Sequence, residues 1–282
     1  MKRLSIVIMM TGLLHIPNVF AASANLGVLA LAEGPVALIR GTARYEAAAG
    51  TPLQPGDFID SDESAVQIEG LAGARIATGP HTRLYLDRKG TATQVILLSG
   101  WLKIDALPGI KGGRLVVDAT GLSVDMSHAV SVVHTDGTDT EVFCDAGTLP
   151  LSVASAGGVD GHTLSLRQEE YAQRKGNGPV DSTGRPDAGF LQSMPSAFFD
   201  PLPAVALKKQ PAPVPGKLRE VSVEDVAPLL SQLPKADMRA LAKRFAPRLA
   251  DASFRAAVTQ QFGGTLEWET ELYRFERNAV RR

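Results

Sequence analysis

The chain has 282 residues, with 29 basic and 30 acidic side chains and a formal net charge of −1. This balance excludes the strongly basic surface that nucleic-acid or anionic-lipid binding usually requires. A single cysteine, Cys144, rules out an internal disulfide, so stability has to come from a packed core.

The first segment, residues 1–24, has the layout of a secretory signal peptide. A positively charged start precedes the apolar run Leu4–Leu14, which Pro17 ends, and small residues then predict cleavage after Ala21 or Ala24. The apolar run is shorter than the roughly 20 residues of a spanning helix, and no later stretch is long enough. We therefore expect a periplasmic protein that does not span the membrane after cleavage.

Residues 25–175 are typical of one β-rich domain. Short segments with apolar side chains at alternate positions recur between Gly, Asp and Pro turns, for example at 36–39, 84–86 and 101–104. No segment of helical period interrupts them, which excludes a parallel βαβ sheet. Sandwich, barrel and solenoid stay open, and the even spacing favours a β-roll or solenoid-like fold over an immunoglobulin-type sandwich.

One turn stands out within this region, at Gly56 and Asp57. We expect the glycine to permit a positive φ and the carboxylate to accept hydrogen bonds from the backbone of the turn. This role is architectural, so a change at Asp57 is expected to lower stability before it alters binding.

The order and spacing of several short segments resemble the FecR domain over about Gly27 to Val153. The matching segments are Gly34–Val36, Arg40–Gly41, Leu53–Ile59, Ser64–Ile68, Ile76–Leu84 and Leu97–Ile104. The chain departs from the family at Ala72–Ala74, where an Asp-Gly-Ser turn is usual, and at Met126–Ser127, where a Gly-Thr pair is frequent.

The resemblance implies a FecR-type β module in an extracytoplasmic setting. The best-known members of the family are membrane-spanning regulators with a cytoplasmic segment that binds a sigma factor. Because this chain shows neither that segment nor a spanning helix, we do not expect sigma-factor regulation from it.

The C-terminal part differs in composition. Residues 176–217 are rich in Gly and Pro and are predicted to be a linker. Residues 218–282 are predicted to form a small helical unit, with Ser222 as a helix N-cap, Asp225 as its capping-box partner and Asp251 as a later cap.

Similar tails, with a stretch like Arg248–Arg255, occur in FecR-domain proteins without a known role. A docking or stabilising appendage is the favoured interpretation of the helical unit. The alternative is a partner-binding surface around Trp268, Tyr273 and the terminal arginines.

The sequence carries no catalytic, cofactor or metal motif: no Gly-x-Ser-x-Gly, His-Glu-x-x-His or phosphate loop is present. His128 and His134 are six residues apart, an even separation that places both on one face if they lie in a single strand, but no nearby cysteine completes a zinc set. An enzyme would need to join one of these histidines to Asp125 or Asp136.

The remaining candidates favour structural roles. Cys144 is predicted to be a buried, inert thiol. An acidic group (Asp57, Asp60, Asp62 and Glu63) lacks the pattern of a calcium loop and is expected to be solvated. A glycosidase-type pair of Asp118 and Asp125 would require spatial proximity.

These observations predict an exported, non-catalytic binding or scaffold module of the cell envelope. Its expected partner is an envelope protein or a glycan, without a cofactor and without nucleic acid. The alternatives are an accessory of an extracytoplasmic signalling system and, less favoured, a hydrolase that acts on the cell wall.

Overall fold

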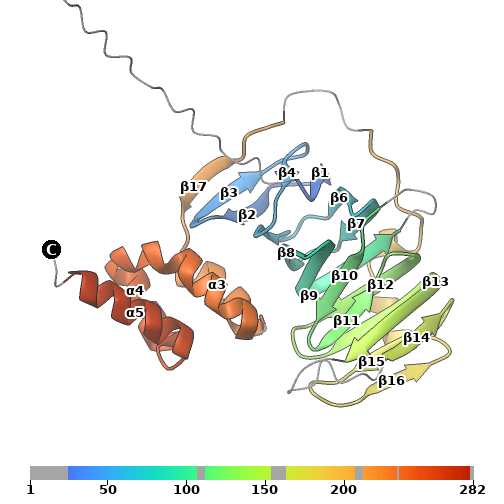
Figure 1. Ribbon diagram of the computed structural model, residues 1–282. Coiled ribbons are helices and arrows are strands. Elements are labelled where there is room, and N and C mark those ends of the chain that lie inside the picture. Colours follow the sequence, from blue (N-terminus) through green and yellow to red (C-terminus); the bar gives the residue numbers. More distant parts are fainter. Residues whose placement is uncertain (1–24, 107–111, 154–162, 207–211, 234, 280–282) are drawn as a thin grey trace, which may run out of the picture.

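The computed structural model describes residues 25–106, 112–153, 163–206, 212–233 and 235–279. It is mainly β, with helices gathered at the C-terminus, which confirms the predicted fold class (Figure 1). The strands are β1 (Gly27–Ala32), β2 (Val36–Arg40), β3 (Ala43–Ala47), β4 (Pro52–Leu53), β5 (Phe58–Asp60), β6 (Val66–Leu71), β7 (Ala74–Thr78), β8 (Arg83–Lys89), β9 (Ala92–Asp105), β10 (Leu115–Ala119), β11 (Leu122–Asp125), β12 (Ala129–Thr135), β13 (Thr140–Val153), β14 (Thr163–Arg167), β15 (Tyr171–Arg174), β16 (Val180–Thr183) and β17 (Gly216–Glu220). The helices are α1 (Ala188–Ser193), α2 (Val223–Gln232), α3 (Lys235–Phe245), α4 (Ala252–Phe262) and α5 (Leu266–Ala279), with short 3-10 turns η1 (Ser196–Phe198) and η2 (Ala246–Ala250).

The strands form two sheets that face each other, so the sandwich is the alternative that the chain adopts. Sheet A has the order β4-β1-β6-β7-β9-β12-β13-β15-β16. Sheet B has the order β17-β3-β2-β5-β8-β9-β10-β11-β13-β14. Among the described strands, only β9 and β10 pair in parallel.

Two long strands, β9 and β13, belong to both sheets and bend from one to the other at Gly100 and Gly147. These glycines have φ values of +96° and +90°, which side-chain-bearing residues rarely adopt. A Cβ at Gly100 would lie 2.6 Å from the Cα of Thr82, and one at Gly147 would lie 2.5 Å from the carbonyl oxygen of His128. Both bends therefore require glycine.

Apolar side chains form three clusters, and the two faces of sheet B contribute to two of them. The central core lies between the sheets, where Leu84, Val95 and Leu97 of sheet B meet side chains from sheet A. Their neighbours in sequence, such as Tyr85 and Ile96, point to the opposite face of sheet B and pack under the C-terminal helices. Because both faces of these strands are buried, apolar and polar residues do not alternate strictly in this part of the sequence.

The segment 176–217, predicted as a linker, contains β16, α1 and η1. Phe190, Met194, Phe198 and Leu202 from this segment are buried against the outer face of sheet A. We call residues 187–205 the strap. These four side chains are spaced four residues apart, and this spacing is a signal of packing within a Pro- and Gly-rich composition.

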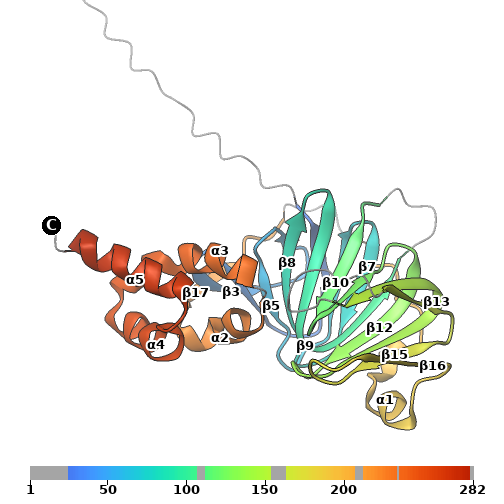
Figure 2. The same cartoon turned by 60° about the horizontal axis from the view of Figure 1, so that its bottom comes forward.

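The predicted start of the helical unit at residue 218 lies in the strand β17, which pairs with β3 at the edge of sheet B, and the first helix, α2, begins at Val223. Asp225 accepts hydrogen bonds from the backbone N–H and hydroxyl of Ser222 at the start of α2, and Asp251 caps α4 through the N–H groups of Ser253 and Phe254. The last helix, α5, has 14 residues, and its Trp268 is fully buried. Figure 2 shows this unit beside the sheets, away from α1 of the strap.

Candidate functional site

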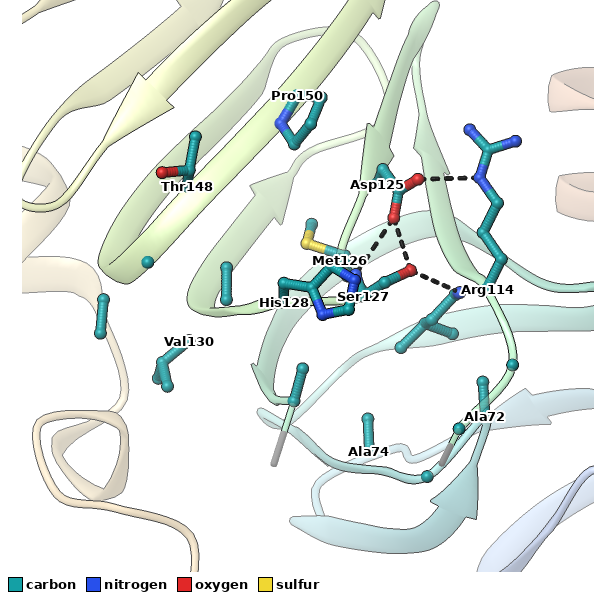
Figure 3. Close-up of a pocket in the computed structure, with 18 residues that line it drawn as sticks. Ala72, Ala74, Arg114, Asp125, Met126, Ser127, His128, Val130, Thr148 and Pro150 are labelled. Atoms are coloured by element: carbon teal, nitrogen blue, oxygen red, sulfur yellow. Dashed lines mark hydrogen bonds and ion pairs between the residues drawn. The ribbon is translucent and has the colours of Figure 1, made fainter. Parts of the chain in front are cut away.

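A cavity of about 850 Å³ opens where the β6–β7 turn, the start of β10, the β11–β12 turn and the bend of β13 meet (Figure 3). Small residues make much of its wall, and its lining includes Ala72, Ala74, Ala106, Gly112, Gly113, Ala129, Ala146 and Gly147. Leu115 and Met126, which also belong to the central core, contribute apolar surface. The size and largely apolar wall are within the range of sites that bind small ligands or a partner side chain.

Polar groups gather on one side of this cavity. The carboxylate of Asp125 accepts hydrogen bonds from the Ser127 hydroxyl at 2.6 Å, the Ser127 N–H at 3.1 Å and Arg114 Nε at 2.8 Å. Burial acts to raise the pKa of Asp125, but the hydrogen bonds from Ser127 and the Arg114 guanidinium outweigh it and lower the pKa. Asp125 is thus an ionised acceptor that two neighbours hold in place.

The two histidines considered for a metal site, and each as an alternative for an enzyme, do not share a strand: His134 lies on β12, and His128 precedes it. His128 is exposed and lines the cavity together with Asp125. Asp125 accepts its side-chain hydrogen bonds from Ser127 and Arg114, and none is formed with His128. His134 stacks on Trp101 with ring centroids 4.2 Å apart.

The partner of His134 is Glu141 on the neighbouring strand, which sequence reasoning missed. The Nδ1 atom of His134 lies 2.8 Å from Glu141 Oε2, and the Tyr171 hydroxyl donates to Glu141 Oε1 at 2.5 Å. Burial acts to raise the pKa of Glu141, but hydrogen bonds from His134 and Tyr171 lower it on balance. The pairing of β12 and β15 on either side of β13 brings these three groups together.

The other acidic candidates are engaged in local structure. Asp136 accepts hydrogen bonds from the N–H groups of Thr138 and Asp139 in its own turn, which lowers its pKa. Asp118 and Asp125 are diagonal neighbours on β10 and β11, and Asp118 accepts a hydrogen bond from Gln94.

Residues of the acidic group near the predicted turn also differ from one another. Asp57 is buried, whereas Asp60 pairs with the half-exposed Arg83 and Asp62 is exposed. In the described part of the chain, no three His, Cys, Asp or Glu side chains cluster as metal ligands would.

The predicted turn at Gly56 and Asp57 is where the helical unit docks. Gly56 has a φ of +89°, and Asp57 accepts hydrogen bonds from the Gln54 N–H at 2.8 Å and from Arg40 at 2.9 and 2.6 Å. Arg244 of α3 donates to the carbonyl oxygen of Gly56 at 2.5 Å.

Arg244 makes two further hydrogen bonds, to the carbonyl oxygens of Gly41 at 2.8 Å and Ile39 at 3.4 Å. Burial lowers its pKa, although nearby Tyr85 and Asp57 oppose the shift. One side chain therefore joins α3 to two turns of sheet B.

The remaining candidate residues that the structure describes take part in no shared site. Cys144 is fully buried in the central core, and burial raises the pKa of its thiol to about 11. On α5, Trp268 is buried and Tyr273 is 63% exposed, so these two side chains do not form one surface patch. The other histidines after residue 24 are His81, which lies in an exposed turn, and His162, which lies outside the described residues, as do the terminal Arg281 and Arg282.

No helix in the described ranges has the length and hydropathy needed to cross a membrane.

No protein-family model matches the chain, and no curated protein matches it. Among solved structures, two crystal structures described as a "putative anti-sigma factor" from Parabacteroides distasonis ATCC 8503 are similar in part. One is 13% identical with a TM-score of 0.37 and covers 46% of this chain and 60% of that chain. The other is 14% identical with a TM-score of 0.39 and covers 48% of this chain and 64% of that chain. The chain thus matches less than two thirds of either protein, and both TM-scores are too low to assign a shared fold.

Proposed function

We propose that this protein is an exported, non-catalytic binding module of the cell envelope and that its partner, a protein or a glycan, inserts a group into the cavity of Figure 3. The signal-peptide layout and the resemblance to the FecR domain support the extracytoplasmic setting. A rigid β-sandwich that holds a recess between its turns is a common frame for recognition.

The observation that carries the proposal is the state of Asp125. A general acid needs a raised pKa, and a general base needs a carboxylate that is open toward the substrate. Asp125 instead has a lowered pKa and is bound by Ser127 and Arg114. This arrangement suits recognition, in which a fixed polar rim orients a ligand over an apolar wall.

A test is provided by closing the cavity without straining the backbone. Gly113 lines the cavity, its φ is outside the left-handed region, and a Cβ there would make ordinary contacts with Thr91 and Ala72. We expect Gly113→Phe to fill the recess. Gly184 has open space around it and lies outside the cavity lining, so Gly184→Phe is the matched control.

The three proteins would be used to capture partners from a crosslinked envelope fraction and to bind purified cell wall. We expect the wild type and Gly184→Phe to retain the same protein or glycan, and Gly113→Phe to lose it. Equal retention by all three proteins would place recognition elsewhere. Hydrolysis of the cell-wall material by the wild type would replace the proposal with an enzyme.

A second candidate, an accessory of an extracytoplasmic signalling system, rests on the FecR resemblance. The same capture experiment distinguishes it from a passive scaffold. A membrane-spanning partner captured through the cavity would support signalling, whereas retention on the glycan alone would support a wall-binding scaffold.

A further inference from the structure

The strap (residues 187–205) covers the outer face of sheet A and crosses its strands. Phe190 is 2% exposed and packs on Trp101 and Tyr171, each with ring centroids 5.2 Å away. Further along the strap, Phe198 and Leu202 are 4% and 6% exposed. Figure 2 shows α1, the first part of the strap, against this side of the molecule near β15 and β16.

The apolar cluster under the strap is separate from the central core. Its buried residues are Ala77, Trp101, Val132 and Tyr171 from the sheet and four strap residues, with the partly buried Phe143 of the sheet packed against them. The core between the sheets contains no strap residue. Removal of the strap would therefore expose one face of sheet A but leave the interior of the sandwich closed. The strap is a covering layer of the sandwich.

The sheet holds the second half of the strap by its backbone. Three side chains of sheet A donate hydrogen bonds to strap carbonyl oxygens: Lys103 to Phe198 at 2.6 Å and Asp200 at 2.8 Å, Arg75 to Leu202 at 3.1 Å, and Gln67 to Pro203 at 2.7 Å. Prolines at 195, 201 and 203 lack an N–H, so this part of the strap has more backbone acceptors than donors, and it faces side chains that donate. Backbone contacts of this kind are used by grooves that bind extended peptides, in which a few pockets select side chains.

The ammonium group of Lys103 requires hydrogen-bond acceptors from the segment that covers this face. Its side chain is 1% exposed, and its nearest carboxylate, Asp145, is 3.9 Å away. Burial lowers its pKa, although Asp145 opposes the shift. A buried ammonium needs hydrogen-bond acceptors, and the strap carbonyls supply them.

We propose that this face of sheet A is a groove for a polypeptide segment, that the strap occupies it in cis, and that a partner segment exchanges with the strap. Like the strap around Phe198, the partner segment would carry an aromatic anchor in a short helical turn, followed by a proline-containing stretch without helix. The partner would place its aromatic side chain where Phe198 lies and its carbonyl oxygens over Lys103. This groove is distinct from the cavity of Figure 3, and neither proposal depends on the other.

The test uses a fluorescent peptide with the sequence of residues 187–205 as a stand-in for the partner. In the wild type the tethered strap competes at an effective concentration of about the millimolar range, so we expect weak binding. Phe198→Ala weakens the strap, and we expect the peptide to bind this variant at least about tenfold more tightly than the wild type. Phe199→Ala is the matched control, because Phe199 is 59% exposed and its loss is expected to leave binding at the wild-type level.

A second pair of variants tests Lys103. In the Phe198→Ala background, Lys103→Met is expected to weaken peptide binding about tenfold or more, since two charge-assisted hydrogen bonds are lost. Lys175→Met, at an exposed lysine, is the control. Circular dichroism confirms that each variant is folded, and Leu202→Ala replaces Phe198→Ala if the latter does not fold.

Folded strap variants that bind the peptide no better than the wild type does would overturn the proposal and make the strap a fixed part of the fold. Dimerisation of Phe198→Ala that the peptide does not suppress would assign the groove to a second copy of the chain and would also overturn it.

Discussion

At the scale of single residues, Asp57 is predicted to stabilise the fold through the turn that it closes. Its buried carboxylate binds both Arg40 and the Gln54 backbone, whereas Asp60 nearby pairs with Arg83, which is 44% exposed. We expect Asp57→Asn to lower the free energy of unfolding by about 2–3 kcal/mol, because it leaves Arg40 without its partner. Asp60→Asn should change it by less than about 1 kcal/mol. Urea unfolding measures both, and lost binding with unchanged stability would contradict this assignment.

Cys144 gives a second prediction at this scale. The thiol is buried in the central core and its pKa is raised to about 11 by burial, so little thiolate forms at pH 8. We expect an aromatic disulfide reagent to react slowly with the folded protein at pH 8 and rapidly in denaturing urea. Fast labelling of the folded chain would show that the thiol is accessible.

At the scale of elements, Asp225 links the start of α2 to the sheet and makes stability depend on pH. Burial acts to raise its pKa, but hydrogen bonds from Arg219, Ser222 and Arg44 lower it strongly. Because the folded pKa is depressed, the stabilisation is fully present above the unfolded value of about 3.9 and is lost as the pH falls toward the folded pKa.

Asp225→Asn should therefore lose about 2 kcal/mol of stability at pH 7 and show a smaller further loss below pH 4 than the wild type does. Urea unfolding at several pH values between 3 and 7 measures this difference. Asp181→Asn, at an exposed position, is the control. Parallel pH profiles for the wild type and Asp225→Asn would contradict the assignment.

The docking of α3 is a further property of elements. Arg244 binds three backbone carbonyl oxygens through its planar guanidinium, which a lysine ammonium cannot reproduce. We expect both Arg244→Met and Arg244→Lys to increase amide hydrogen exchange in α3 and α4, by about 10- to 100-fold for hydrogen bonds of this kind. Lys243→Met, next in sequence and exposed, should leave exchange unchanged. Unchanged exchange in Arg244→Met would show that apolar packing alone docks the helices.

At the scale of the whole molecule, the helices and sheet B share one apolar cluster. Ile39, Phe58, Tyr85, Ile96 and Leu98 of the sheet pack against side chains of α2 to α5. A chain that ends at residue 215 would expose these five side chains as a patch. We expect it to bind an apolar dye such as ANS and to aggregate, while the full chain does neither. A monomeric truncated protein without dye binding would show that the helices are an independent unit.

The sequence by itself determined the fold class and the position of the C-terminal helices, but not that of α1. Short strand segments between Gly, Asp and Pro turns predicted the β region, and the caps at Ser222 and Asp251 predicted the starts of α2 and α4. These signals depend on residues that are close in the chain, so local backbone preferences carry them.

Only the tertiary structure decided the contacts between distant segments. The cavity around Asp125, the pairing of His134 with Glu141, and the docking of Arg244 on Gly56 all join different elements. The strap was predicted as part of a linker because its composition resembles a loop. Its burial follows from the apolar face of sheet A and from Lys103, which needs the strap carbonyls, and neither the face nor that need can be read from local sequence.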